Sequence, residues 1–154
     1  MRKIILAGLL VVLAGLIQNT DLFSIWGIKS NLLLAVMIAV SLFIDSFSWY
    51  LLLVLLSVIL VRFGVGFRPE LLVMAFLLIT AYWMRRVLPW RPSIVNCFLV
   101  AVTTILFYLL ADASYLFDAP FAVAGEIVYS ILFCILIYDF FRYLGDNEEQ
   151  IFRR

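Results

Sequence analysis

The feature that most constrains this chain is a succession of six apolar stretches separated by short polar segments. The stretches are Ile4–Ile17, Leu32–Ile44, Phe47–Val61, Leu71–Met84, Ile94–Ala111 and Phe121–Phe141. Hydrophobic residues make up 67% and charged residues 14% of the 154 residues. Soluble chains contain about 45–50% apolar and about 25% charged residues. Because so few polar side chains are available to cover a water-soluble fold, we expect the lipid bilayer to be the solvent.

We therefore predict an all-α fold, a single polytopic bundle of six transmembrane helices. The expected spans are 4–19, 31–45, 47–62, 70–85, 94–111 and 121–141, followed by a short, frayed cytoplasmic tail at 145–154. Several stretches are shorter than the ~20 residues that normally cross the hydrocarbon core, so we expect flanking polar residues to lie at the interface. Arg2 and Lys3 before the first stretch are typical of a signal peptide, but no good cleavage site follows. We expect a retained first helix.

The boundary at Asp45 and Ser46 decides the number of helices. Without a turn there, the segment 32–61 would form one helix of about 45 Å, well beyond a ~30 Å hydrocarbon core. With six helices and a cytoplasmic N-terminus, eight of the eleven Lys and Arg residues fall on the cytoplasmic side. They are Arg2, Lys3, Arg85, Arg86, Arg91, Arg142, Arg153 and Arg154. Five helices give a less asymmetric division, so the positive-inside rule favours six helices with both termini in the cytoplasm.

Motifs for catalysis, metal binding and nucleotide binding are missing from the sequence. The chain has no His, which excludes His-based triads and His-containing metal sites. Cys97 and Cys134 lie in apolar stretches without CxxC spacing, as expected of small buried hydrophobic residues. There is no Walker A, HExxH or GxSxG motif, and the net charge of +1 argues against nucleic acid. We therefore expect no enzyme activity, no cofactor and no nucleic-acid partner.

Ionisable residues within or near the apolar stretches are functional candidates, because a charge inside a bilayer costs several kcal/mol. Asp45 and Asp112 fit solvated positions at the ends of spans, and Asp139 fits a helical ion pair with Arg142. Glu126 lies about two turns into the last stretch and is the strongest candidate. It either binds a proton, a ligand or another helix, or it lies at the outer headgroup level in contact with water.

Two further patterns predict contacts between helices. Four polar side chains of the last two stretches either hydrogen-bond across helices or bond to a carbonyl of their own helix. They are Asn96, Thr103, Thr104 and Ser130. The pairs Ala7-Gly8 and Ala14-Gly15, one heptad apart, predict a close-packing face for a neighbouring helix inside or outside the protein.

Two short motifs near the N-terminus carry a resemblance. The first is Leu16-Ile17-Gln18-Asn19-Thr20, and the second extends from Ile25 to Leu34, with Gly27, Ile28, Asn31 and Leu32 as its key positions. They resemble the opening of the rod shape-determining protein MreD family, in which a Leu-Gln-Ser/Thr-like sequence ends the first helix and Gly-hydrophobic-x-Pro-Asn-Leu leads into the second. Ser30 stands where Pro is usual. The family's third helix is usually Gly-rich and ends in Asp, whereas the segment 47–61 has neither residue.

The resemblance implies a non-catalytic scaffold subunit of the bacterial cell-elongation (rod-shape, peptidoglycan-synthesis) complex, multi-pass in the inner (cytoplasmic) membrane. Its partners would be a bitopic cell-shape scaffold protein, the actin-like filament and the wall-synthesis enzymes, bound through helix faces. Gln18, Gly27, Asn31 and Glu126 are the candidate partner or ligand contacts. The alternative follows from a similar fold, that of the substrate-binding subunits of energy-coupling-factor vitamin transporters. A membrane-embedded enzyme acting on lipid is the least favoured, because it needs two cooperating polar groups at one depth.

Overall fold

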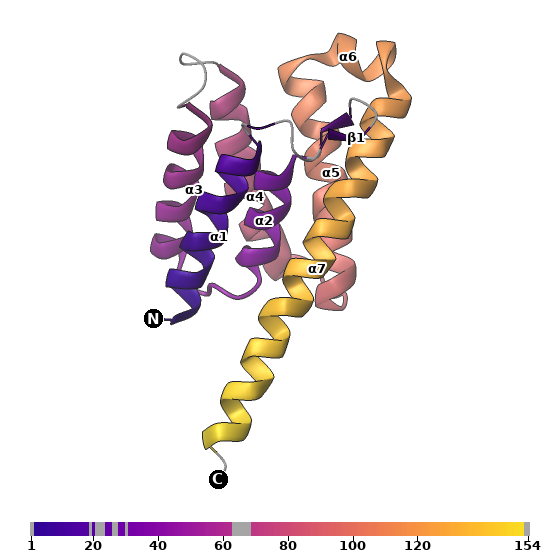
Figure 1. Cartoon of the computed structure of the whole chain (residues 1–154). Coiled ribbons are helices and arrows are strands. Elements are labelled where there is room, and N and C mark those ends of the chain that lie inside the picture. Colours follow the sequence, from indigo (N-terminus) through magenta and orange to yellow (C-terminus); the bar gives the residue numbers. More distant parts are fainter. Residues whose placement is uncertain are drawn as a thin grey trace.

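The computed structural model describes the backbone of residues 2–18, 20, 24–25, 28–29, 31–62 and 69–152. This part of the chain contains seven helices and one short pair of strands (Figure 1). The helices are α1 (Arg2–Gln18), α2 (Leu32–Ser41), α3 (Phe47–Arg62), α4 (Pro69–Val87), α5 (Pro92–Ala111), α6 (Ala113–Asp118) and α7 (Pro120–Phe152). Strands β1 (Ser24–Ile25) and β2 (Ile28–Lys29) pair antiparallel, with Ile25 opposite Ile28. The prediction of an all-helical fold is confirmed, with this two-residue pair as an addition.

Apart from the short α6, the helices run up and down the bundle, and successive ones point in opposite directions (Figure 1). The start of α1, the turn between α2 and α3 and the connection between α4 and α5 lie at one end, which we call the N-terminal end. The short helix α6 joins α5 to α7 at the opposite end, which we call the α6 end. Helix α7 has 33 residues and projects beyond the bundle at the N-terminal end. It includes the segment 145–152, which we expected to be a frayed tail.

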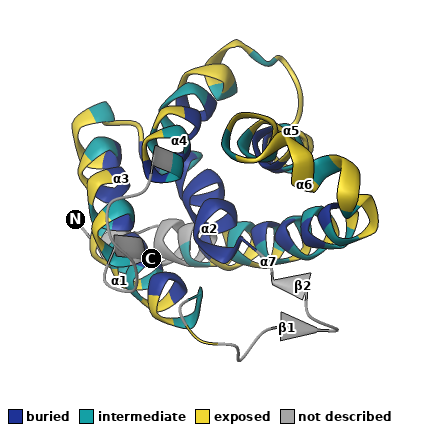
Figure 2. Cartoon of the chain, turned by 90° about the horizontal axis from the view of Figure 1, so that it is seen from above, coloured by how far each residue is buried: buried dark blue, intermediate teal, exposed yellow. Residues whose placement is uncertain are grey.

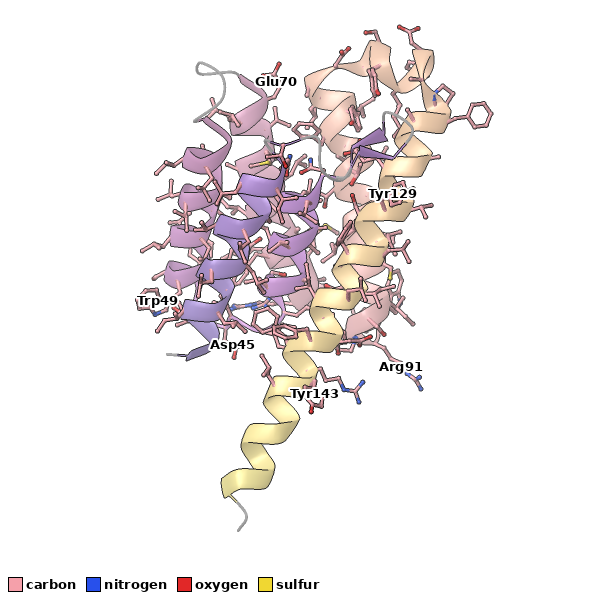
Figure 3. All side chains as sticks on the ribbon, viewed as in Figure 1. Asp45, Trp49, Glu70, Arg91, Tyr129 and Tyr143 are labelled. Carbon is pink, nitrogen blue, oxygen red and sulfur yellow. The ribbon has the colours of Figure 1, made fainter. Side chains whose placement is uncertain are left out.

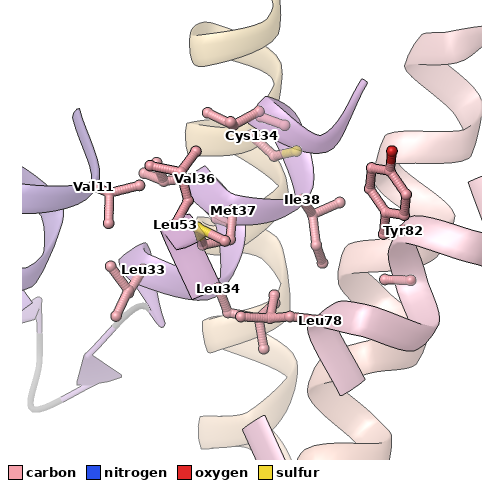
Figure 4. Packing of buried hydrophobic residues seen from close by; sticks show 14 of the residues in the cluster. Val11, Leu33, Leu34, Val36, Met37, Ile38, Leu53, Leu78, Tyr82 and Cys134 are labelled. Atoms are coloured by element: carbon pink, nitrogen blue, oxygen red, sulfur yellow. The ribbon is translucent and has the colours of Figure 1, made fainter. Parts of the chain in front are cut away.

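Helix α2 is the centre of the bundle. All ten of its residues are buried, and it contacts α1, α3, α4, α5 and α7 (Figure 2). Its one polar residue, Ser41, donates a hydrogen bond from its hydroxyl to the carbonyl of Ile38 at 2.7 Å. A helix that is apolar on all sides has to be covered on all sides. The side chains packed around it include Val11 of α1, Leu53 of α3, Leu78 of α4 and Cys134 of α7 (Figure 4).

The break that we expected at Asp45 and Ser46 is present. Helix α2 ends at Ser41, α3 begins at Phe47, and the residues 44–46 are not helical. Helix α2 is therefore only about 15 Å long at 1.5 Å per residue, which is shorter than the second span that we expected. The Asp45 side chain is fully exposed, as predicted for a solvated turn.

Side chains of α4 hold this turn by binding its backbone carbonyls. Arg85 Nη2 donates to the carbonyl of Ile44 at 2.9 Å, and the Tyr82 hydroxyl donates to the carbonyl of Asp45. Arg86 Nη2 also donates to the carbonyl of Asp45, at 2.9 Å. The Arg85 guanidinium lies 4.3 Å from the centroid of the Tyr82 ring, and its side chain is only 6% exposed. These bonds satisfy carbonyls that have no partner within a helix.

The small-residue face of α1 packs against another helix of the same chain. Ala7 and Ala14 are buried, and Gly15 is buried against α3. A Cβ atom added to Gly15 would lie 2.9 Å from Cβ of Leu60, which is closer than real Cβ contacts. Gly15 therefore permits the close approach of α1 and α3, and the internal alternative for this face is the one observed.

Large apolar side chains also cover the outside of the described helices. On α1 they are Ile5, Leu9, Leu13 and Leu16, each about half exposed. Two helices are long and apolar enough to cross a membrane, over the ranges Pro92–Ala111 and Pro120–Leu144. Three shorter apolar helices occupy Ile4–Gln18, Leu32–Ser41 and Phe47–Leu60. Exposed apolar faces of this kind are typical of helices that contact lipid.

Candidate functional site at the α6 end of the bundle

Three of the four candidate residues come together at the α6 end. Gln18 is the last residue of α1, Asn31 precedes α2, and Glu126 lies in the second turn of α7. The fourth, Gly27, lies outside the described residues. The segments that carry the three residues are joined by hydrogen bonds, which are described below.

Gln18 and Asn31 together cap the start of α2. The Leu33 backbone N–H donates to Gln18 Oε1 at 2.9 Å, and the Leu34 N–H donates to Asn31 Oδ1 at 3.3 Å. Gln18 Nε2 also donates to Asn31 Oδ1, at 3.4 Å. The first N–H groups of a helix have no partner within it, and in an apolar setting each unpaired group is costly. The two motif residues remove that cost, so they fix how α1 and α2 meet.

Glu126 extends this joint to two more helices. Its carboxylate is buried, with 6% of the residue exposed. The Tyr108 hydroxyl of α5 donates to Glu126 Oε2, and the backbone N–H of Asn31 also hydrogen-bonds to the carboxylate. The carboxylate therefore links α7 to α5 and to the start of α2. An anchoring role between helices is observed, and contact with a partner or ligand stays a prediction.

Tyr108 was not singled out from the sequence. Its ring stacks on that of Tyr115 in α6, with centroids 5.2 Å apart and planes 25° apart. The pairing of Tyr108 with Glu126 depends on the register of α5 against α7, which no local pattern reveals. The one available signal is spacing, because Tyr108 follows Thr104 by one helical turn.

Asp112 has a different role at the same end. Its Oδ1 accepts hydrogen bonds from the Ser114 hydroxyl at 2.6 Å and from the Tyr115 backbone N–H at 3.3 Å, and it is the N-cap of α6. The Ser114 bond, with help from the Tyr115 bond, holds the pKa of the Asp112 carboxyl below its usual range. Asp112 is exposed, as expected, and it starts the helix that connects α5 with α7.

Other polar groups of α5 and α7 are buried without partners. The Thr104 hydroxyl, the Ser130 hydroxyl and both amide atoms of Asn96 make no hydrogen bond. Neither a bond across helices nor a bond to the preceding turn, the two alternatives from the sequence, is observed for these groups. They differ from Ser57 and Thr80, whose hydroxyls donate to carbonyls of their own helices at 2.7 and 2.9 Å.

The described residues offer few groups for chemistry. No set of three His, Cys, Asp or Glu side chains within them is placed to hold a metal ion. Cys134 is buried and Cys97 partly so, and both are free thiols. Asp139 is exposed on α7. The arrangement provides one buried carboxylate with hydrogen-bond donors, at a hydrogen-bonded joint of four helices.

In comparisons with known proteins, no family model, no curated protein and no solved structure matches this chain. The interpretation of its function therefore depends on its own residues.

Proposed function

We propose that this chain is a six-span protein of the bacterial inner membrane, with both termini in the cytoplasm, and that it is a non-catalytic scaffold subunit of the cell-elongation complex. In this role it binds a bitopic cell-shape scaffold protein and wall-synthesis enzymes through its helix faces. The bound partners, rather than this chain, carry out peptidoglycan synthesis.

The orientation is supported by the charges at the two ends of the bundle. Arg85 and Arg86 bind the turn between α2 and α3 at the N-terminal end, where Arg91 also lies, and Glu70, Asp112 and Asp118 belong to segments at the α6 end. Figure 3 shows Arg91 and Glu70 at opposite ends. Basic residues are enriched on the cytoplasmic side of membrane proteins. The N-terminal end is therefore the cytoplasmic end in this proposal.

The observation that carries the scaffold role is the joint of Gln18 and Asn31. These are two of the polar residues of the motifs that resemble the MreD family, and they hydrogen-bond to each other and to the first turn of α2. The resemblance therefore involves residues that stabilise the fold, and not residues that bind a substrate. The outward apolar faces of the helices offer the surface on which partner helices would pack.

The test is affinity purification of the tagged chain from its native membrane in mild detergent, followed by mass spectrometry. We expect the bitopic scaffold and wall-synthesis enzymes to be recovered. Recovery of paired cytoplasmic ATPases with a coupling membrane subunit would overturn the proposal in favour of a vitamin-transporter subunit.

Variants on separate faces sharpen this test. Leu9, Leu55 and Leu136 are exposed on α1, α3 and α7, respectively. Each Leu→Trp change enlarges one face and keeps it apolar, so the bundle itself should fold normally. We expect the change on the contacted face to reduce partner recovery, while the changes on the other faces serve as matched controls. Full recovery with all three variants would contradict binding through these faces.

A further inference from the structure

We propose that the interface between α5 and α7 binds a small monovalent cation, held by oxygen atoms of Glu126, Ser130 and Thr104. The cation is either a metal ion such as Na⁺ or a protonated primary amine, which share the same preference for oxygen acceptors. This inference does not depend on the scaffold role.

The hydrogen bond between Tyr108 and Glu126 sets the register of the two helices. Helices α5 and α7 pack against each other in opposite directions (Figure 1). One turn from Tyr108 toward the N-terminal end of the bundle is Thr104, and the same step from Glu126 leads to Ser130. Thr104 and Ser130 therefore lie at one level, about 6 Å from the level of the pair.

Burial shows that both hydroxyls point into the protein. Thr104 and Ser130 each have a relative exposure of 0%, and neither hydroxyl has a hydrogen-bond partner. Ser41 and Ser57 are equally buried, yet their hydroxyls donate to carbonyls three residues earlier at 2.7 Å. The helix backbone can thus satisfy a buried serine in this chain. Ser130 has no such bond, so its hydroxyl has the capacity to bind another partner.

The charge of Glu126 indicates the sign of the charge on the ligand. Glu126 is a buried acid. Its known partners, the Tyr108 hydroxyl and the Asn31 N–H, are neutral donors. A carboxylate has about four acceptor positions, so it retains capacity for a cation, whereas an anion would be repelled.

The number of carboxylates limits the charge of the cation. A divalent ion in a buried site normally has several carboxylate ligands, and the described His, Cys, Asp and Glu side chains form no group of three that could hold a metal ion. One carboxylate with two hydroxyls matches a single positive charge. Glu126 and Ser130 are four residues apart on one helix, the spacing at which two side chains of a helix bind one ion in metalloproteases.

The test is thermal unfolding of the purified full chain in detergent, followed with a thiol-reactive fluorescent maleimide. Cys134 is buried and Cys97 is partly buried, so both report unfolding. We expect the Tm to rise saturably with NaCl or with methylammonium chloride, and not with N-methyl-D-glucamine chloride at equal ionic strength. A response to NaCl alone identifies a metal ion, and a response to methylammonium alone identifies an amine. An equal response to all three salts would overturn the proposal.

Three variants connect the response to the site. Ser130→Ala and Thr104→Val each remove one ligand oxygen and should weaken the apparent affinity about tenfold. Glu126→Gln should abolish the rise of the Tm with cation concentration. If that variant does not fold, the two hydroxyl variants still test the site. Ser57→Ala removes a buried hydroxyl that is bonded to its own helix, and it should respond as the unaltered chain does. If Ser130→Ala and Thr104→Val also respond normally, the site is refuted.

Discussion

Gln18, at the end of α1, accepts a hydrogen bond of 2.9 Å from the backbone N–H of Leu33, in the first turn of α2. The side chain of one helix thereby caps the next helix. Because α2 contacts five other helices, the position of this cap affects how the whole bundle is assembled. The same cap involves Asn31, which connects it to Glu126 and so to α7.

Loss of this cap should destabilise the protein. Gln18→Met keeps the length of the side chain but removes the acceptor for Leu33 N–H, and we expect it to lower the free energy of unfolding by about 1–2 kcal/mol. The measurement is unfolding in mixed micelles with increasing SDS, followed by circular dichroism. Thr20→Val is the control, because the exposed Thr20 hydroxyl bonds to the Ile17 carbonyl at 2.8 Å and water can replace it. Equal losses in the two variants would contradict the capping role.

The two glycines of α1 should respond differently to the same substitution. Gly15→Ala places a Cβ 2.9 Å from Leu60 Cβ, whereas Gly8→Ala places one 3.9 Å from Leu53 Cδ2, an ordinary contact. We expect Gly15→Ala to cost about 1–3 kcal/mol, as overpacking does. Gly8→Ala should be neutral or slightly stabilising, because Ala favours helix. In the double variant with Leu60→Ala, the loss at Gly15 should be partly recovered; if it is not, crowding against Leu60 is not the cause.

Arg85 should contribute to stability through the turn between α2 and α3. Arg85→Met removes the donor to the Ile44 carbonyl and the contact with the Tyr82 ring, and we expect a loss of about 1.5–3 kcal/mol. Arg91→Met makes the same change of charge at an exposed position at the same end of the bundle and should have little effect. The unfolding transition in SDS measures both.

The Asp45→Asn variant distinguishes the hydrogen bond of Arg85 to the Ile44 carbonyl from its ion pair with Asp45. The Asp45 carboxylate is 4.0 Å from Arg85 Nη2 and fully exposed, so Asp45→Asn should change stability little. If Asp45→Asn costs as much as Arg85→Met, the contribution of Arg85 comes from the ion pair and not from the carbonyl.

Much of the fold could be predicted from the apolar stretches alone. The break near Asp45 followed from the length of a bilayer and the distribution of Lys and Arg, and the structure has it between Ser41 and Phe47. Helix α6 was not predicted, because six residues between two apolar stretches carry no periodic pattern. Its signals are local, namely the cap provided by Asp112 and the hydrogen bond from Ser114.

The candidate site was predictable in part. The sequence motifs indicate Gln18 and Asn31, and the charge in an apolar stretch indicates Glu126. The structure brings the three residues together. Tyr108 was missed, because its contact with Glu126 depends on the register of two helices joined through α6. That register is set by tertiary packing, which propensity and periodicity do not encode.

The proposed six-span topology predicts which sites are reachable from each side of the membrane. Asp45 lies at the N-terminal end, and Glu70 and Ala113 belong to segments at the α6 end. In a background with Cys97→Ala and Cys134→Ala, a membrane-impermeant maleimide on intact spheroplasts should label Glu70→Cys and Ala113→Cys. Asp45→Cys should be labelled only after permeabilisation, since α3 separates it from Glu70. Labelling of all three variants before permeabilisation would refute the topology. Labelling of Asp45→Cys alone would indicate the opposite orientation, with both termini outside.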